Sequence, residues 1–318
     1  MGMTAPRCAV AIVGAGFMAE EHARAFAAVP GVELVGIHSR TRSRAERVAR
    51  EAGIAGIFDS ITELYEVTQA DLVVVAITET ATKDVALECL AQPWTILLEK
   101  PPGLSVAEAE EIALAAGGRE RPVLVGLNRR FISSTRAVLD DLVASDSRRY
   151  IRVLDQQSLD EARGHGHPEA VVQHYMYANS IHVIDYLSLL GRGALESVER
   201  VLPWNPREPG VVLALIRFAS GDVGVYEGIW NGPGPWAVML VTEEKRWELR
   251  PLEQAAFQLP DERQLVSVPS HEWDREFKPG LRLQAEHAVA ATRGEHCEIP
   301  TIGESLRTMR LIEAIFEE

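Results

Sequence analysis

A glycine pattern that directly follows an apolar run near the N-terminus constrains this fold more than any other feature. Residues 9–13 read Ala-Val-Ala-Ile-Val, and the chain continues Gly-Ala-Gly-Phe-Met-Ala, which is a G-x-G-x-x-A pattern. Gly14 permits a tight turn, Gly16 lets the backbone approach a pyrophosphate, and Ala19 is small enough for a helix to pack closely on the strand. The N-terminus of that helix then faces the phosphates. In this context the pattern predicts a dinucleotide site rather than a purely structural turn.

The first 126 residues alternate short β-branched runs with helical patterns. The expected strands are 9–13, 32–37, 71–77, 94–98 and 122–125, and helices such as 18–29 and 42–52 lie between them. Repeated strand-helix-strand units imply a parallel sheet covered by helices on both faces. Ser105 and Glu108 form a capping box that opens a further helix. The sequence therefore predicts an α/β fold that begins with a doubly wound Rossmann domain over residues 1–127.

The periodicity changes after Asn128. A helix is expected over 133–143, a strand over 150–157, a loop rich in Gly and His over 164–168 and a strongly periodic helix over 179–190. Strand-like runs at 211–218, 223–230 and 236–242 follow, and helices over 281–291 and 302–317 close the chain. Consecutive strands joined by Gly, Pro and Asn turns indicate a meander. A second α/β domain over 128–318, built on a largely antiparallel sheet, is therefore predicted.

Length and charge narrow the possible partners. The chain has 318 residues, which at about 150 residues per domain corresponds to roughly two domains. It carries 32 Lys and Arg against 46 Asp and Glu, a net charge of -14 that repels polyanions and argues against a nucleic-acid partner. Five arginines between residues 40 and 50 either bind an anion locally or form a solvated helix face. No apolar run is long enough for a membrane span.

The cysteines and histidines give no sign of a metal site. Cys8, Cys89 and Cys297 form no CxxC pair, which argues against a disulfide scaffold and a thiolate zinc site and favours a reducing, cytoplasmic compartment. The four histidines between residues 165 and 182 match no standard zinc spacing. We therefore expect no bound metal.

The end of the second expected strand bears on the choice of cofactor. A site specific for NAD usually places a carboxylate there, which accepts a hydrogen bond from the ribose 2'-hydroxyl. Ser39 and Arg40 stand at this point instead, and neither repels a phosphate. We expect NADP(H) to be preferred. In the alternative, Arg40 only stacks on the adenine and NAD(H) is accepted as well.

A lysine directly after the fifth expected strand is a candidate catalytic group. Residues 99–102 read Glu-Lys-Pro-Pro. Residues just past the carboxyl ends of parallel strands line the ligand crevice, so Lys100 is expected beside the nicotinamide. A lysine there can hydrogen-bond a substrate hydroxyl and help to move its proton. The alternative is an ordinary surface lysine.

Four short motifs occur in order along the chain. They are the G-x-G-x-x-A pattern followed by Glu-His-Ala at 21–23, Glu-Lys-Pro at 99–101, Gly-Leu-Asn-Arg-Arg-Phe at 126–131 and His-Val-Ile-Asp at 182–185. Together they resemble the Gfo/Idh/MocA family, named for glucose-fructose oxidoreductase and inositol dehydrogenase. The resemblance implies NAD(P)-dependent chemistry on sugars or cyclitols, a C-terminal sheet often used for oligomerisation, and a cis peptide between Lys100 and Pro101. The expected cofactor contacts are Gly14, Gly16, Phe17, Met18, Ser39, Arg40, Thr78, Glu99 and Lys100.

The family's second catalytic element resembles D-x-x-x-H on a helix, which brings a carboxylate and an imidazole to one face. His182 supplies the imidazole here, unless it is only a histidine packed under the sheet, and Ala178 stands in the place of the carboxylate. Asp185 shares the helical face of His182 and is expected to orient the ring or touch substrate. A polar active-site loop is expected over 163–179. The expected substrate contacts are Arg129, Tyr175, Tyr177, Asn179 and Asp185.

Two classes of function fit these observations. The first is an oxidoreductase that moves a hydride between NADP(H) or NAD(H) and a hydroxyl or keto carbon of a sugar, cyclitol or nucleotide-sugar. Lys100 and His182 would handle the hydroxyl proton. The second is a dinucleotide-binding sensor without turnover, and a related option is a cofactor-dependent, redox-neutral glycosidase. The expected partners are a small-molecule substrate and further copies of the chain in a dimer or tetramer, without nucleic acid or membrane.

Overall fold

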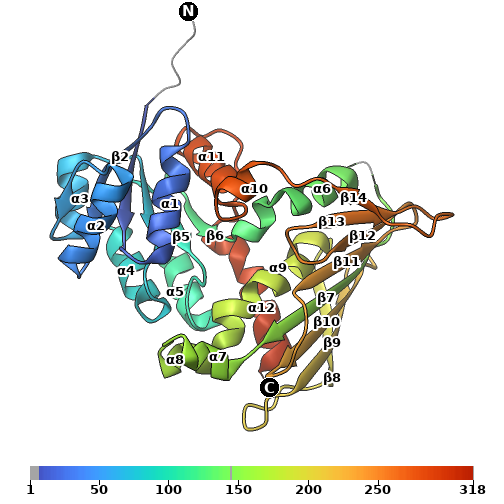
Figure 1. Cartoon of the computed structure of the whole chain (residues 1–318). Coiled ribbons are helices and arrows are strands. Elements are labelled where there is room, and N and C mark those ends of the chain that lie inside the picture. Colours follow the sequence, from blue (N-terminus) through green and yellow to red (C-terminus); the bar gives the residue numbers. More distant parts are fainter. Residues whose placement is uncertain (1–6, 144, 318) are drawn as a thin grey trace, which may run out of the picture. The chain divides into compact units, whose positions relative to one another are not determined.

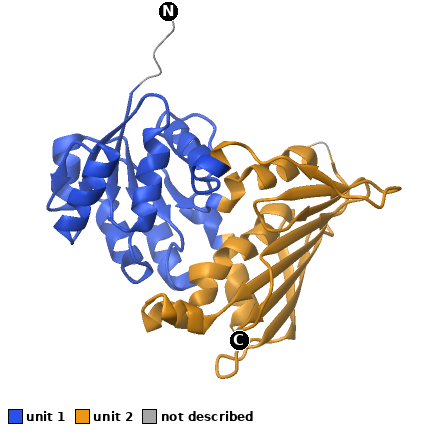
Figure 2. Ribbon diagram, viewed as in Figure 1, with its two compact units in different colours: residues 1–128, 275–306 blue, residues 129–274, 307–318 orange. Residues whose placement is uncertain are grey.

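The structure, a computed structural model, describes residues 7–143 and 145–317 (Figure 1). The chain forms two compact units (Figure 2). Unit 1 contains the chain up to Asn128 together with Arg275–Leu306, and unit 2 contains Arg129–Asp274 and Arg307–Glu318. The expected division after residue 127 leaves residues 275–306 in the second domain, whereas in the structure this late segment belongs to unit 1.

Unit 1 is built on a parallel six-stranded sheet. Its strands are β1 (Cys8–Val13), β2 (Val32–His38), β3 (Ile57–Phe58), β4 (Leu72–Val75), β5 (Thr95–Glu99) and β6 (Val123–Gly126). They lie in the order β3-β2-β1-β4-β5-β6, and every neighbouring pair is parallel. This is the doubly wound order of a Rossmann fold, so the predicted fold class is confirmed. The strand β3 was not predicted, because two residues are too few to show a period.

Helices flank this sheet (Figure 1). They are α1 (Phe17–Ala27), α2 (Arg42–Ala52), α3 (Ile61–Thr68), α4 (Thr82–Cys89), α5 (Val106–Ala115) and α11 (Leu281–Thr292), with a short 3-10 turn η1 (Glu79–Ala81). The predicted cap of α5 is present, since Ser105 Oγ accepts a hydrogen bond from the Glu108 N–H at 3.2 Å. Helix α11 packs against α1, and Arg282 donates to the carbonyl of Ala28 at 3.0 Å.

Unit 2 is built on an eight-stranded sheet. Its strands are β7 (Tyr150–Gln157), β8 (Leu195–Leu202), β9 (Val211–Phe218), β10 (Val223–Trp230), β11 (Ala237–Val241), β12 (Arg246–Leu249), β13 (Ala255–Gln258) and β14 (Val266–Val268). The order is β14-β13-β12-β11-β7-β10-β9-β8. Only the pair β7 and β10 is parallel among the described strands of this sheet, which confirms the prediction of a largely antiparallel sheet.

The helices of unit 2 gather on one face of its sheet (Figure 1). They are α6 (Ser133–Leu142), α7 (Leu159–Gly164), α8 (Glu169–Gln173), the π-helix η3 (Met176–Ser180), α9 (Ile181–Leu190) and α12 (Ile302–Phe316), which begins in unit 1. The described residues also form the 3-10 turn η2 (Asn128–Phe131) and the short helix α10 (Trp273–Glu276). The prediction of a loop over 163–179 is wrong, because α8 and η3 occupy most of it. Short turns of this kind have too few residues to show helical periodicity.

Alternation along β7 shows how the sheet of unit 2 is buried. Ile151, Val153, Asp155 and Gln157 are buried on the face that α9 covers, whereas the residues between them are half-buried. A strand that is covered on one face is expected to alternate in this way. Two polar side chains therefore share the buried face with two apolar ones, and both lie toward the carboxyl end of the strand.

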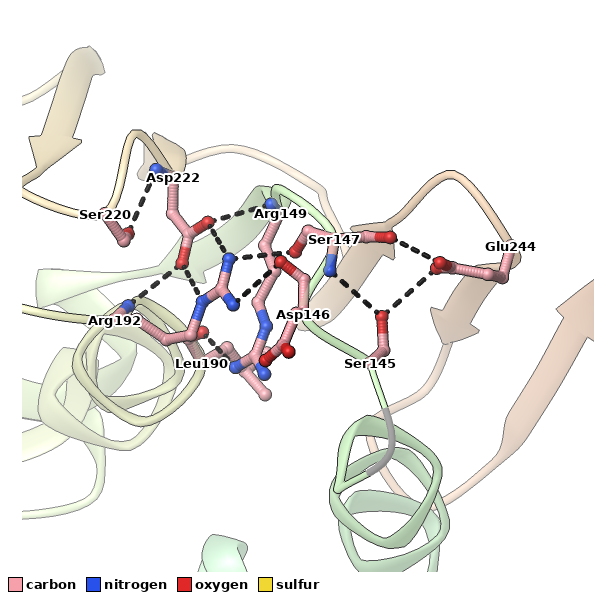
Figure 3. A network of polar contacts seen from close by, with 9 residues as sticks. All are labelled: Ser145, Asp146, Ser147, Arg149, Leu190, Arg192, Ser220, Asp222 and Glu244. Atoms are coloured by element: carbon pink, nitrogen blue, oxygen red, sulfur yellow. Dashed lines mark hydrogen bonds and ion pairs between the residues drawn. The ribbon is translucent and has the colours of Figure 1, made fainter.

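A cluster of polar contacts joins the β9–β10 turn to two other segments of unit 2 (Figure 3). Asp222 is fully buried and accepts hydrogen bonds from Arg192 Nε and Nη2, each at 2.9 Å. It also accepts from the backbone N–H of Arg149 at 2.9 Å. Burial alone would raise the pKa of Asp222, but these charge-assisted and backbone hydrogen bonds lower the pKa to about 2. The carboxylate thus fastens the turn in its ionised form.

Candidate active site

A cavity of about 420 Å³ lies in unit 1 at the carboxyl ends of β1, β2 and β4. Its lining comprises residues 13–18, 38–41 and 76–79, together with Arg44, Ile61, Ala81, Val85 and Glu88. Strand β1 has β2 on one side and β4 on the other, so the cavity lies where the strand order reverses. Ligands of open α/β sheets bind in such a crevice. Seven predicted cofactor residues line it: Gly14, Gly16, Phe17, Met18, Ser39, Arg40 and Thr78.

The glycines of this cavity fit the close approach of a ligand. Gly14 has φ +118°, and a Cβ there would lie 1.9 Å from the carbonyl oxygen of Ala76. No other residue type can therefore form this turn without moving β4. A Cβ on Gly16 would meet nothing within 4 Å, and Gly16 caps α1 without a side-chain hydrogen bond to the helix. The first N–H groups of α1 are thus left to an anion such as a pyrophosphate.

Four of the five arginines between residues 40 and 50 divide into two groups. Arg42 pairs with Asp59 at 2.6 Å, and Arg47 pairs with Glu20 and Glu51. Arg40 and Arg44 instead line the cavity next to Ser39 and Thr41. Spacing alone could not separate these groups, because the partners Asp59 and Glu20 come from other elements. The acidic residues of the lining, Glu79 and Glu88, follow β4 rather than β2 and were not predicted.

Lys100 follows β5 directly, and a buried pair stands behind it. Glu99 is 8% exposed, and its Oε1 lies 2.6 Å from Nε2 of His22 on α1. Its other oxygen accepts from the backbone N–H of Lys100 at 3.1 Å. Neither Glu99 nor Lys100 lines the cavity described above, and Glu99 holds the backbone at Lys100 through this hydrogen bond. The peptide between Lys100 and Pro101 is cis, as the resemblance implied.

His22 was missed as a member of this arrangement. It was noted only as part of the motif at 21–23, and its 1% exposed side chain meets Glu99 from a residue 77 positions away. The sequence offers one signal for such a contact. The histidine lies on the buried face of a helix, and the carboxylate belongs to a motif at the end of a strand.

In unit 2, His182 lies on α9 and is 8% exposed. Its ring centroid is 6.1 Å from that of Trp236. Ala178 lies one turn earlier in the π-helix η3 and is 3% exposed. A π-turn immediately before a helix is frequent at functional sites. The position of the expected carboxylate is therefore buried and holds a methyl group.

A second cavity of about 350 Å³ lies within unit 2, and it is defined here as the polar pocket. Its lining residues are Gln156, Gln157, Ser158, Glu161, His165, Tyr175, Asn179 and Trp236. Tyr175 and Asn179 are predicted substrate contacts, and the structure brings them together here. The two glutamines were missed because a strand pattern does not show which polar residues end at a cavity.

Three other predicted substrate residues make contacts outside the polar pocket. The Tyr177 hydroxyl donates to Glu317 at 2.6 Å, and both its burial and that carboxylate raise the pKa of Tyr177. Asp185 is 3% exposed and accepts from Arg130 Nε and Nη2 at 2.7 Å each. The Thr308 hydroxyl also donates to Asp185 at 2.7 Å.

Arg129 pairs with Glu253 at 3.0 Å, and its guanidinium lies 6.0 Å from the ring of Trp236. None of Tyr177, Asp185 and Arg129 lines the polar pocket. Bidentate pairing of Asp185 with Arg130 shows that this carboxylate is used to fix α9 to the turn η2. Each of these contacts joins residues that are far apart in the sequence, so the spacing of residues could not predict it.

Residues 7–143 and 145–317 contain no group of three or more His, Cys, Asp or Glu arranged to hold a metal ion. Within the same residues, none of the helices combines the length and apolarity that crossing a bilayer requires.

Comparison with known proteins finds a family model that matches the N-terminal part of the chain. Residues 8–127 match the family model described as oxidoreductase family, NAD-binding Rossmann fold, of the Gfo/Idh/MocA group. The chain is 25% identical over 233 residues to 4-carboxy-2-hydroxymuconate-6-semialdehyde dehydrogenase of Sphingobium sp., covering 71% of this chain and 73% of the relative. It is 30% identical over 211 residues to inositol 2-dehydrogenase 2 of Saccharopolyspora erythraea, covering 64% and 58%. Other curated relatives are matched over 35% to 43% of their length.

The fold as a whole is also similar to solved structures. A dehydrogenase from Chromobacterium violaceum superposes with a TM-score of 0.84 at 20% identity, covering 98% of this chain and 95% of that one. At this identity the likeness shows the fold alone, and it extends over both units. The resemblance stated from the sequence motifs is thereby confirmed for residues 8–127, which match the Gfo/Idh/MocA model of an oxidoreductase family with an NAD-binding Rossmann fold.

Proposed function

We propose that this protein is an NADP(H)-preferring oxidoreductase that acts on a CH–OH group of a sugar, cyclitol or nucleotide-sugar. The observation that carries the proposal is the cavity of unit 1, in which a glycine cradle and the uncapped start of α1 adjoin Ser39, Arg40 and Arg44. A 2'-phosphate at the end of β2 would meet two guanidinium groups and no carboxylate from that strand. Inositol 2-dehydrogenase among the relatives supports a polyhydroxylated substrate.

The residues of the chain have separate tasks in this proposal. Gly14 and Gly16 would hold the pyrophosphate, and Arg40 and Arg44 the 2'-phosphate. The bound nicotinamide supplies the hydride acceptor or donor. Lys100 hydrogen-bonds the reacting hydroxyl; as a neutral amine it takes up the hydroxyl proton during oxidation, and as an ammonium it returns the proton during reduction. His182 is proposed to share this proton.

The polar pocket is proposed to hold the rest of the substrate. Tyr175 and Asn179 can each hydrogen-bond a hydroxyl, and the Trp236 ring offers an apolar surface beside them. Tyr177, Asp185 and Arg129 are left out of the proposed substrate contacts, because their polar groups bind Glu317, Arg130 and Glu253 instead.

Replacing Lys100 by methionine tests the catalytic part of the proposal. Methionine keeps the length and the apolar stem of lysine but removes the donors, so NADPH affinity should persist while hydride transfer falls by about 10² to 10⁴. The measurement is single-turnover NADPH oxidation with a keto-sugar, with NADPH binding followed by fluorescence. His182→Gln should lower turnover less, and the two losses should not add because both residues act on one hydroxyl. Unchanged turnover in Lys100→Met would refute the assigned role.

A sensor without turnover is the second candidate, and Ala178 favours it because the expected carboxylate is replaced by a buried methyl group. A thermal-shift panel with NADPH, NADH and sugars distinguishes the two. A ligand at 100 times its dissociation constant stabilises the folded protein by about 2.7 kcal/mol. Cofactor binding without turnover on any bound sugar would favour the sensor. Product formation without net change in NADPH would indicate the redox-neutral glycosidase.

We also propose that the chain forms a homo-oligomer in the cytoplasm. The face of the eight-stranded sheet opposite its helices carries a shallow groove lined by Arg152, Leu154, Met239 and neighbouring side chains. Light scattering with size-exclusion chromatography tests this, since a monomer at micromolar concentration would contradict it. Three free cysteines fit a reducing compartment.

A further inference from the structure

Unit 2 buries a carboxylate to which the proposed mechanism gives no role. Asp155 is 1% exposed and lies on the α9-covered face of β7, two residues before Gln157. An ionised carboxylate in such a place is unfavourable unless donors surround it. Gln157 Nε2 donates to Asp155 Oδ1 at 2.7 Å, and the Tyr226 hydroxyl donates to Oδ2 at 2.8 Å. Burial nevertheless raises the pKa of Asp155.

The neighbouring strand is shaped to bring the Tyr226 hydroxyl to this carboxylate. In the parallel pairing of β10 with β7, Gly228 is the register partner of Asp155. A Cβ on Gly228 would lie 2.7 Å from the Tyr226 hydroxyl oxygen. The tyrosine ring therefore lies over a position that only glycine leaves open. Sequence and register thus combine to supply Asp155 with its second donor.

The hydrogen-bond chain continues from Asp155 to the polar pocket. Gln157 Oε1 accepts from Asn179 Nδ2 at 2.8 Å, and both amides line the pocket. Both oxygens of Asp155 accept hydrogen bonds in this arrangement, so Gln157 turns its nitrogen toward Asp155 and its oxygen toward Asn179. Asn179 must then turn its own nitrogen toward Gln157. The Asn179 side chain then keeps Oδ1, which is an acceptor, together with the second Nδ2 hydrogen.

We propose that Asp155 is a positioning residue that fixes the direction of this chain, so that Asn179 presents a carbonyl oxygen to a hydroxyl donor of the substrate. The inference rests on the proposed function, since it takes the polar pocket as the substrate site. The eight lining residues include Glu161 and no lysine or arginine. The part of the substrate that enters this pocket is therefore an uncharged polyol moiety rather than a phosphate or a carboxylate.

A double-mutant cycle between Asp155 and Asn179 tests the direction of the chain. In Asn179→Asp, the Gln157 amide lies between two carboxylates, at positions 155 and 179. Its nitrogen can donate to one of them, and its oxygen then faces an oxygen of the other, whichever way the amide turns. In Asp155→Asn, the new amide can still accept from Gln157 and donate to the Tyr226 oxygen. In the double variant Gln157 can turn, because the amide introduced at position 155 would donate to the Gln157 oxygen. The Gln157 nitrogen would then donate to the carboxylate introduced at position 179.

The thermal unfolding midpoint without ligand should therefore fall by several degrees in Asn179→Asp, stay near the parent in Asp155→Asn, and recover in the double variant. Asn231→Asp is the matched control, because Asn231 Oδ1 already accepts from the Leu159 N–H and a carboxylate there keeps that bond. Its effect should be small and equal in both backgrounds. An effect of Asn179→Asp that is equal in both backgrounds would overturn the proposal.

The ligand part is measured by steady-state oxidation of myo-inositol and of an inositol monophosphate with NADP⁺. KM for myo-inositol should rise about tenfold or more in Asn179→Leu with a much smaller change in kcat, as expected when a hydrogen-bonding partner of the substrate is lost. The monophosphate should be the poorer substrate. If the unfolding cycle shows rescue but KM is unchanged in Asn179→Leu, the acceptor role of Asn179 is wrong. If the parent oxidises neither probe nor any sugar of the thermal-shift panel, the proposed function fails, whereas the unfolding cycle still decides the role of Asp155.

Discussion

At the scale of single residues, the side chains at the end of β2 are the basis of the proposed cofactor preference. Arg42 and Arg47 already have carboxylate partners, whereas Arg40 and Arg44 line the cofactor cavity. A guanidinium that lines a cavity can form a bidentate pair with a phosphate. The distinction between paired and cavity-lining arginines is therefore the basis for expecting NADP(H).

Exchange of Ser39 for aspartate together with Arg40 for alanine should reverse the cofactor preference. A charge-assisted hydrogen bond contributes about 1.5 to 3 kcal/mol, so NADPH should bind roughly 10- to 100-fold more weakly. NADH should bind as well or better, because the new carboxylate can accept from the 2'-hydroxyl. Dissociation constants from fluorescence titration provide the measurement. Arg42→Ala is the control and should leave both constants unchanged, whereas tighter NADH binding by the parent would contradict the assignment.

At the scale of elements, the junction of η3 and α9 gives unit 2 its proposed active-site face. The π-turn places Asn179 on the polar pocket and buries Ala178 and Tyr177, while α9 buries His182 against the sheet. One residue of difference in the winding of a helix changes which side chains share a face. The π-turn therefore decides which side chains of this segment face the polar pocket. The D-x-x-x-H spacing, which counts four residues back from His182, does not decide it.

Restoring the carboxylate by Ala178→Asp should not improve the enzyme. Ala178 is 3% exposed, and a polar group that is buried without a partner costs about 1 to 3 kcal/mol. We expect a lower unfolding midpoint and turnover at or below that of the parent. Tyr177→Phe should leave turnover unchanged, since its hydroxyl binds Glu317, whereas Asn179→Ala should lower it. A many-fold gain of turnover in Ala178→Asp together with unchanged turnover in Asn179→Ala would contradict this prediction.

At the scale of the whole molecule, two units are each closed by contacts between distant parts of the chain. Unit 1 includes α11, which packs on α1 although more than 250 residues separate them. In unit 2, Asp222 joins the β9–β10 turn to the start of β7 and to the residues after α9 (Figure 3). Stability of each unit thus depends on pairings that local sequence does not contain.

The Asp222 cluster predicts an acid-sensitive stability. Its pKa falls from the ordinary value of 3.8 to about 2 in the folded state. Since the folded pKa is the lower one, this stabilisation is complete above about pH 4 and is lost as the pH falls toward 2, by about 2 kcal/mol. Urea unfolding between pH 2 and 6 should show this slope, and Asp222→Asn should flatten it. Asp59→Asn removes an exposed carboxylate and is the control; an equal change of slope in both variants would contradict the prediction.

Local sequence patterns and motifs were sufficient to predict the two sheets and the crevice of unit 1. Glycine spacing and alternating periodicity predicted the parallel sheet, the cofactor crevice and the position of Lys100 after β5, because these depend on short stretches of chain whose geometry is fixed by residue type. The antiparallel sheet of unit 2 was predicted for the same reason. The motifs also predicted the family whose model residues 8–127 match.

Tertiary structure alone decided the rest. The pairing of His22 with Glu99, that of Asp185 with Arg130, and the hydrogen bond between Gln157 and Asn179 join residues that are 22 to 77 positions apart and lie on different elements. Short turns such as η3 have no periodic signature, and the return of residues 275–306 to unit 1 has no local signal at all. Hydrogen bonds between buried groups depend on which elements meet, and that is set by the packing of the whole chain rather than by the order of its residues.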